Sequence, residues 1–121
     1  MEFLTQEQFK ILSNPGVEST QLLSPHNSES NRVTIMRVVV KLGASQPAYK
    51  HASSEQIWIA VSGQGTLILK GQTRRSFAAG EVVRFADGDM RGFTNSGIEP
   101  FIYLSVTSPP INFSDAYTAE K

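Results

Sequence analysis

The sequence predicts an all-β domain, folded as a sandwich or a barrel, on three observations. Short apolar segments recur along most of the chain, and turns that contain glycine separate them. Residues 33–42 alternate with period two, with Met36 and Val38 on one face and Arg37 on the other, as in a strand with one buried face. The length of 121 residues suits one domain with one core, so we treat residues 1–121 as a single domain.

The N-terminal part predicts one short helix over residues 5–13. Thr5 and Gln8 have the spacing of a capping box, and an Asn-Pro-Gly sequence stops the helix. Residues 17–23 are then a candidate strand. The turn formers of residues 24–31 predict a loop.

Glycine-containing turns divide the rest of the chain into strands. After Gly63 and Gly65, which suit a hairpin turn, the pattern returns at once to apolar residues. The expected strands are residues 33–42, 57–61, 66–70, 74–78, 82–85, 90–95 and 101–107. Two prolines end the sheet, so residues 108–121 are expected to form a C-terminal tail, loose from residue 111 onward.

Composition argues against several classes of function. Lys plus Arg and Asp plus Glu are 11 each, so no basic surface indicates a nucleic-acid or membrane partner. The chain has no cysteine, which removes disulfides, thiol nucleophiles and cysteine-based metal sites. The first residues lack the pattern of a secretory signal, and no apolar run is long enough to span a bilayer. We therefore expect a cytoplasmic protein.

Two stretches, residues 43–63 and 80–95, resemble the paired motifs of the cupin superfamily of small jelly-roll barrels. In the first stretch, Gly43, His51, Glu55 and Gly63 stand at the family's positions for glycine, histidine, glutamate and glycine. In the second, the matching residues are Gly80, Gly88 and Asn95. The resemblance implies a jelly-roll β-barrel with the short N-terminal helix added to it.

The same motifs depart from the family at the metal ligands. Members of the family hold a metal inside the barrel with two histidines and a glutamate of the first motif and a histidine of the second. Tyr49 and Arg91 stand in place of two of these histidines, and Ala86 replaces a proline. Only His51 and Glu55 remain, so we expect no cofactor. Stable metal sites need three or four ligands, which disfavours an ion held by these two residues alone. The alternative is a divalent metal held by His51 and Glu55, with Tyr49 as a third ligand.

The family register places Tyr49, His51, Glu55, Arg91 and Phe93 inside the barrel. Arg91 always carries a positive charge and cannot ligate a metal. We expect its guanidinium to replace the metal electrostatically, paired with Glu55 or with an anionic ligand. The alternatives are that Arg91 faces solvent at the rim and that His51, Glu55 and Tyr49 form a polar core without a ligand.

Three functions follow as hypotheses. The first is binding of a small polar, possibly anionic, molecule inside the barrel by the five residues named above. The second is an acid–base enzyme, an isomerase, epimerase or lyase, with His51 as base and Tyr49 as acid, or a metal-dependent, dioxygenase-like enzyme. The third is a structural protein with a vestigial pocket. We also expect a homodimer, formed through an outer apolar face that includes Trp58 and Ala60.

Overall fold

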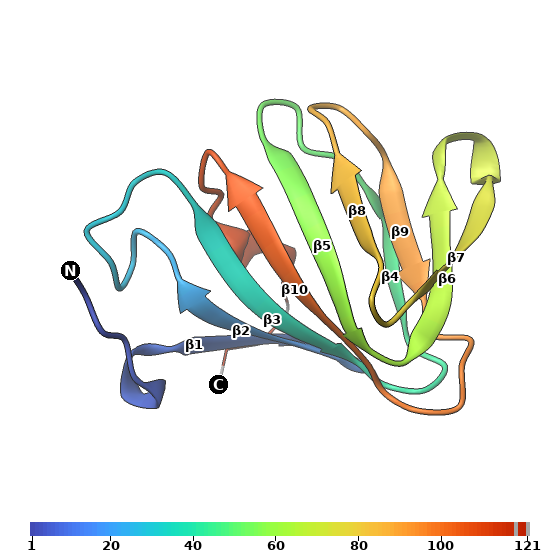
Figure 1. Ribbon diagram of the computed structural model, residues 1–121, viewed down its shortest axis with the longest axis horizontal. Helices are drawn as coiled ribbons and strands as arrows, with labels where there is room; N and C mark the ends of the chain where they lie inside the picture. Colours follow the sequence, from blue (N-terminus) through green and yellow to red (C-terminus); the bar gives the residue numbers. More distant parts are fainter. Residues whose placement is uncertain (118, 121) are drawn as a thin grey trace.

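The computed structural model, which describes residues 1–117 and 119–120, is built from two antiparallel sheets that face each other (Figure 1). The larger sheet has the order β11-β1-β2-β3-β10-β5-β8, and the smaller has the order β4-β9-β6-β7. The larger sheet contains β1 (Lys10–Asn14), β2 (Val17–Leu23), β3 (Thr34–Val40), β5 (Glu55–Ser62), β8 (Val82–Phe85), β10 (Phe101–Ser108) and β11 (Ala119–Glu120). The smaller contains β4 (Ser45–Tyr49), β6 (Gln64–Leu69), β7 (Arg74–Ala78) and β9 (Arg91–Thr94). The predicted all-β jelly-roll class is confirmed.

An aromatic cluster fills the space between the sheets. Trp58 of β5 is fully buried and packs on Tyr103 at 4.3 Å and on Phe85 at 5.1 Å between ring centroids. Phe93 of β9 packs on Phe101 at 4.4 Å. These large rings form a buried apolar core between the sheets, and Tyr103 of this core also lines the cavity described below.

The face of β5 is a correction to the sequence analysis. Apolar residues lie on both faces of this strand, so alternation alone could not assign its inner side. The structure turns Gln56, Trp58 and Ala60 inward, which leaves Ile57 and Ile59 outside. The expectation that Trp58 and Ala60 belong to an outer face was therefore wrong.

The N-terminal helix is a second correction. The Thr5–Gln8 capping box forms, but it starts only the single 3-10 turn η1 (Gln6–Gln8). Residues 10–14 instead form β1, which pairs with β2 and buries Leu12. A helix of nine residues is marginal in water by itself, and pairing with β2 gives these backbone groups better partners.

The segment after β10 is not a loose tail. The 3-10 turn η3 (Phe113–Ala116) buries Phe113, and β11 pairs with β1. The Tyr117 hydroxyl forms a hydrogen bond with Ser19 of β2. This segment thus closes one side of the barrel mouth. No helix among the described residues is long and apolar enough to cross a membrane.

Candidate ligand-binding site

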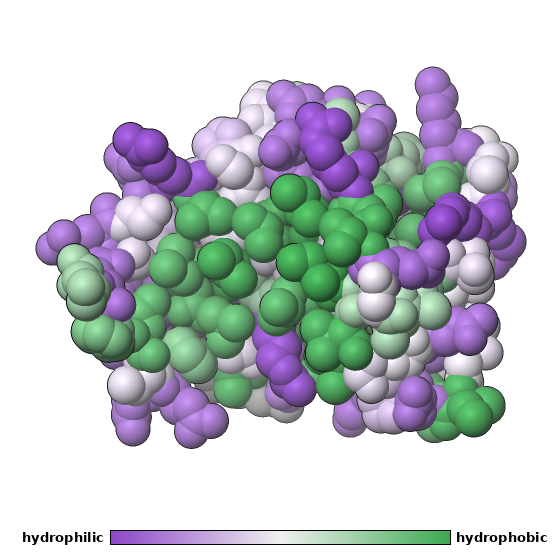
Figure 2. All heavy atoms as spheres, viewed as in Figure 1, coloured by the Kyte–Doolittle hydropathy of each residue, from purple (hydrophilic) through white to green (hydrophobic). Residues whose placement is uncertain are grey.

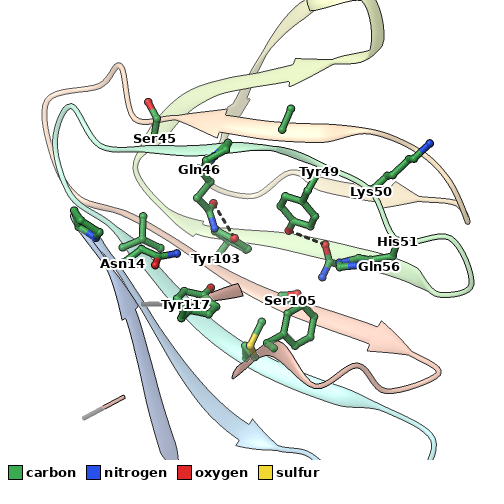
Figure 3. A pocket seen from close by; sticks show the side chains of 16 residues that line it. Asn14, Ser45, Gln46, Tyr49, Lys50, His51, Gln56, Tyr103, Ser105 and Tyr117 are labelled. Atoms are coloured by element: carbon green, nitrogen blue, oxygen red, sulfur yellow. Dashed lines mark hydrogen bonds between the residues drawn. The ribbon is translucent and has the colours of Figure 1, made fainter. Parts of the chain in front are cut away.

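A cavity of about 640 Å³ opens at the mouth of the barrel, between β4, β5, β10 and the C-terminal segment (Figure 3). Its volume is in the range of sites for small organic molecules. Apolar side chains, among them Val17, Met36 and Phe113, form part of its wall. The polar or amphipathic side chains on the wall include Gln46, Tyr49, His51, Gln56, Tyr103, Ser105 and Tyr117.

A hydrogen-bonded group fixes one side of this cavity. Gln56 donates to Thr107 Oγ1 at 2.9 Å, and its Oε1 accepts from Trp58 Nε1 at 2.9 Å and from the Tyr49 hydroxyl at 3.4 Å. The Tyr103 hydroxyl donates to Gln46 Oε1 at 3.0 Å. Both amide side chains are thereby held in one orientation before any ligand arrives.

Three phenols give the cavity flat, uncharged walls. Burial raises the pKa of Tyr49, Tyr103 and Tyr117 above the ordinary value of a phenol. All three therefore keep their protons at neutral pH. Their rings offer stacking surfaces, and their hydroxyls can donate or accept hydrogen bonds.

His51 follows β4 and lines the cavity beside Tyr49 and Phe113. Its ring centroid lies 5.1 Å from that of Tyr49 and 5.6 Å from that of Phe113, both in edge-on contacts. Burial lowers the pKa of His51 to about 4, and the charge of Arg91 lowers it further in the same direction. The imidazole is therefore neutral at physiological pH, and its Nε2 is buried without a hydrogen-bond partner among residues 1–117 and 119–120.

Ser105 of β10 is the second polar group of the wall without a partner. Its hydroxyl oxygen is buried and makes no hydrogen bond within the described part of the chain. Buried polar groups are almost always paired, because each unpaired one costs about 1–3 kcal/mol. Two such groups among the residues that line one cavity make this cavity the candidate site for a small molecule with hydrogen-bonding groups.

Arg91 is buried, but it does not line the cavity. The rings of Tyr49 and Phe85 lie 5.1 and 4.6 Å from its guanidinium carbon, and Nη1 donates to the carbonyl of Asp89 at 2.9 Å. Its Nε and Nη2 are unpaired, and no carboxylate in residues 1–117 and 119–120 forms an ion pair with it. Burial lowers the pKa of this guanidinium. The positive charge thus lies behind Tyr49 rather than in contact with the cavity.

Glu55 and Phe93 are not placed as expected. Glu55 is on the outer face of β5, where its carboxylate accepts from Arg84 at 2.8 and 3.1 Å. The expected pairing of Glu55 with Arg91 is therefore wrong. Phe93 points inward, but it is part of the closed aromatic core and does not line the cavity.

The residues present do not suit a metal ion. Glu55, the one carboxylate retained from the family's ligand set, is on the opposite side of the sheet from His51. In the described ranges, no three His, Cys, Asp or Glu side chains gather closely enough to hold an ion. His51 has only phenol and amide oxygens beside it, which are weak ligands compared with thiolate, imidazole or carboxylate.

Comparison with known proteins decides the family. The family model described as "Cupin domain" matches residues 36–107, more than half of the chain. The chain is a cupin. The match includes most of β3 and β10 and both motif stretches, so this cupin keeps the barrel although its metal-ligand positions have changed.

Solved structures similar to this cupin agree on the fold. KdgF from Halomonas sp. is 19% identical with a TM-score of 0.74, and the match covers 91% of this chain and 96% of KdgF. The polyketide cyclase RemF from Streptomyces resistomycificus is 16% identical with a TM-score of 0.77, covering 100% and 84%. PAC13 of Streptomyces, solved with uridine, is 20% identical with a TM-score of 0.75, covering 100% and 88%. No protein of curated function matched the sequence.

Five polar or amphipathic residues of the wall were not predicted from the sequence: Gln46, Gln56, Tyr103, Ser105 and Tyr117. Ser105 interrupts an apolar run and shares strand parity with Tyr103 and Thr107, and this interruption was the available signal. Gln56 stands directly before the apolar run of residues 57–61 and shares strand parity with Trp58. Gln46 and Tyr117 had no such signal, because β4 and the C-terminal segment were not recognised as ordered structure.

Proposed function

We propose that this cupin binds a neutral, flat small molecule that carries hydroxyl, carbonyl or amide groups. One observation carries the proposal: His51 and Ser105, each with a buried polar atom that has no hydrogen-bond partner among the described residues, both line one cavity of about 640 Å³. A neutral imidazole and a hydroxyl can each donate or accept, so both suit such groups. The tyrosine rings provide matching flat surfaces.

The charge of the cavity argues for a neutral ligand over the anionic one expected from sequence. Lys50 is the one charged side chain on the wall as described, and it is exposed and extends away from the three tyrosines (Figure 3). Arg91 is separated from the cavity by the Tyr49 ring. An anion would therefore lose its hydration without gaining a direct ion pair.

The test is a melting-temperature screen with matched pairs of compounds. Each pair contains a neutral ring compound, such as uridine, a hydroxyquinone or a flavone, and its carboxylated counterpart. Uridine is included because PAC13 was solved with it. We expect neutral members to raise the melting temperature of the protein more than their anionic partners do. The cavity offers hydrogen bonds to a neutral compound but no direct ion pair to an anion.

Calorimetry on the best compound then tests the two unpaired groups. His51→Leu and Ser105→Ala should each weaken binding about three- to tenfold, the value of one hydrogen bond between neutral groups. His26→Leu and Ser76→Ala, at exposed positions away from the cavity, are the matched controls and should change nothing. Equal affinity in all four variants, or a screen without any binder, would overturn the proposal.

Acid–base catalysis is the second candidate, and the edge contact between His51 and Tyr49 favours it. Against it, a pKa of about 4 makes His51 a weak base at neutral pH, and the raised pKa of Tyr49 makes it a weak acid. If a binder is converted, His51→Gln should abolish turnover while binding persists. If binding and turnover fall together, His51 holds the ligand rather than acting on it.

A further inference from the structure

The inner face of β5 and β10 carries polar side chains at the cavity, although the outer face of the same strands is apolar. Figure 2 shows hydrophobic side chains covering the middle of the face on which β10 and β5 lie. On the inner side, Gln56 of β5 lies directly across from Thr107 of β10, and both side chains are buried. Buried polar side chains need partners, so the hydrogen bonds of this pair decide what the wall can offer to a ligand.

Trp58 fixes the orientation of the Gln56 amide. The indole Nε1 can only donate, and it donates to Gln56 Oε1 at 2.9 Å. On the other side of the amide, Gln56 Nε2 donates to Thr107 Oγ1 at 2.9 Å. A flipped amide would place the N–H groups of Gln56 and Trp58 against each other, so Oε1 stays on the side of Trp58.

The fixed carbonyl oxygen of Gln56 commits the proton of Tyr49. The Tyr49 hydroxyl lies 3.4 Å from Gln56 Oε1, which can only accept, so the hydroxyl is the donor. Burial raises the pKa of Tyr49, so this proton is present at neutral pH. Tyr103 likewise donates to Gln46 Oε1 at 3.0 Å (Figure 3). Because both protons are committed, the two phenol oxygens have only lone pairs left for a molecule in the cavity.

We infer that the cavity selects for hydrogen-bond donors, and that Gln56 is the positioning residue for this selection because it holds the Tyr49 proton away from the ligand. The inference rests on the proposed function, since it needs a molecule in the cavity. It narrows the ligand class to rings with O–H or N–H groups that face Tyr49 and Tyr103. A compound with only carbonyl or ether oxygens there would place lone pairs against lone pairs. His51 and Ser105 can donate or accept, so they do not discriminate.

Calorimetry with matched forms of one compound tests the selection. The probes are hydroxyflavone, methoxyflavone and flavone in one series, and uridine and 3-methyluridine in the other. We expect the form with the O–H or N–H group to bind the wild type about three- to tenfold more tightly than the forms without it, the value of one hydrogen bond between neutral groups. Flavone removes the hydroxyl without adding a methyl group, so it separates loss of the proton from steric crowding.

Two variants test whether Gln56 is the cause. In Gln56→Met, a side chain of similar volume is only a weak acceptor for the Tyr49 proton. In Trp58→Phe, the indole donor is absent and the Gln56 amide is free to turn. The Tyr49 hydroxyl can then donate to the ligand in both variants, so the preference for the hydroxylated form should fall to within twofold. Gln64→Met, at an exposed position of β6, is the matched control and should keep the wild-type ratio of affinities.

A measurement without ligand keeps this inference distinguishable from the proposed function. The chain has one tryptophan, so its indole N–H gives a single NMR resonance that reports the bond to Gln56. Gln56→Met should move this resonance upfield and speed its hydrogen exchange, whereas Gln64→Met should change neither. An indole resonance that Gln56→Met leaves unchanged would overturn the inference alone. So would equal affinity of the wild type for all forms of a bound probe, or a wild-type ratio in both Gln56→Met and Trp58→Phe. A screen without any binder would overturn the proposed function as well.

Discussion

The imidazole of His51 should make the stability of the protein depend on pH. Its pKa is lowered from 6.5 to about 4 in the folded state, by burial against Tyr49 and Phe113 and by the Arg91 charge. As pH falls below 6.5, the unfolded chain takes up this proton first, so the free energy of unfolding decreases down to about pH 4. We expect a loss of about 1–2 kcal/mol between pH 7 and pH 5, after allowance for the part of the ring that solvent reaches.

Denaturant unfolding at several pH values measures this slope. His51→Gln cannot take up the proton and should flatten the curve, whereas His26→Gln, at an exposed loop position, should keep the wild-type slope. If the free energy of unfolding depends on pH in the same way for the wild type and His51→Gln, the His51 ring is not buried from solvent as the structure shows.

Arg91 is a buried cation with two unpaired nitrogens, and its removal should not weaken the fold. Methionine fills a similar volume without a charge, so Arg91→Met should leave the free energy of unfolding unchanged or raise it by up to about 2 kcal/mol. Arg91→Lys keeps the charge but loses the planar contacts with Tyr49 and Phe85, and should be less stable than the wild type. Thermal unfolding compares the three proteins, and a methionine variant that is much less stable than the lysine variant would contradict this view of the site.

At the scale of elements, Gly65 sets how closely β6 approaches β9. A Cβ at this position would lie 2.1 Å from Phe93 Cζ and 2.7 Å from the Thr94 carbonyl oxygen. Gly65→Ala should therefore destabilise the protein by about 1–3 kcal/mol through overpacking. Combining it with Phe93→Leu should cost less than the two changes added together, because the smaller side chain removes one clash. Strict additivity in thermal or denaturant unfolding would mean that the two strands do not press on each other here.

The elements also show what the sequence could and could not predict. Residues 74–78 and 82–85 were predicted at the bounds that β7 and β8 have, because glycine turns mark both ends. β1 was taken for a helix because the capping box of Thr5 and Gln8, just before it, does form. The pairing of β1 with β2, which decides its structure, has no signal within the segment itself. β4 was missed because its five residues include a proline and little apolar alternation, so only its pairing with β9 identifies it.

At the scale of the whole molecule, the barrel could be predicted but the composition of its cavity could not. Tyr49 and His51 were predicted to face the interior, and both line the cavity. The family register predicted that Glu55 points into the barrel. In the structure, Gln56, one residue later, points inward instead. A shift of one residue reverses the face of a strand, and only packing of the large Trp58 ring into the core decides between the two. Tyr117 reaches the cavity through the fold of the last residues, which no local pattern indicates.

The most direct test of the proposed function is a crystal structure of the protein soaked with the best neutral compound from the screen. The account predicts a flat molecule between the tyrosine rings, with polar atoms within hydrogen-bond distance of both His51 Nε2 and Ser105 Oγ. A cavity that keeps both atoms paired with ordered water while the compound binds elsewhere, or one filled by the protein's own side chains, would contradict it.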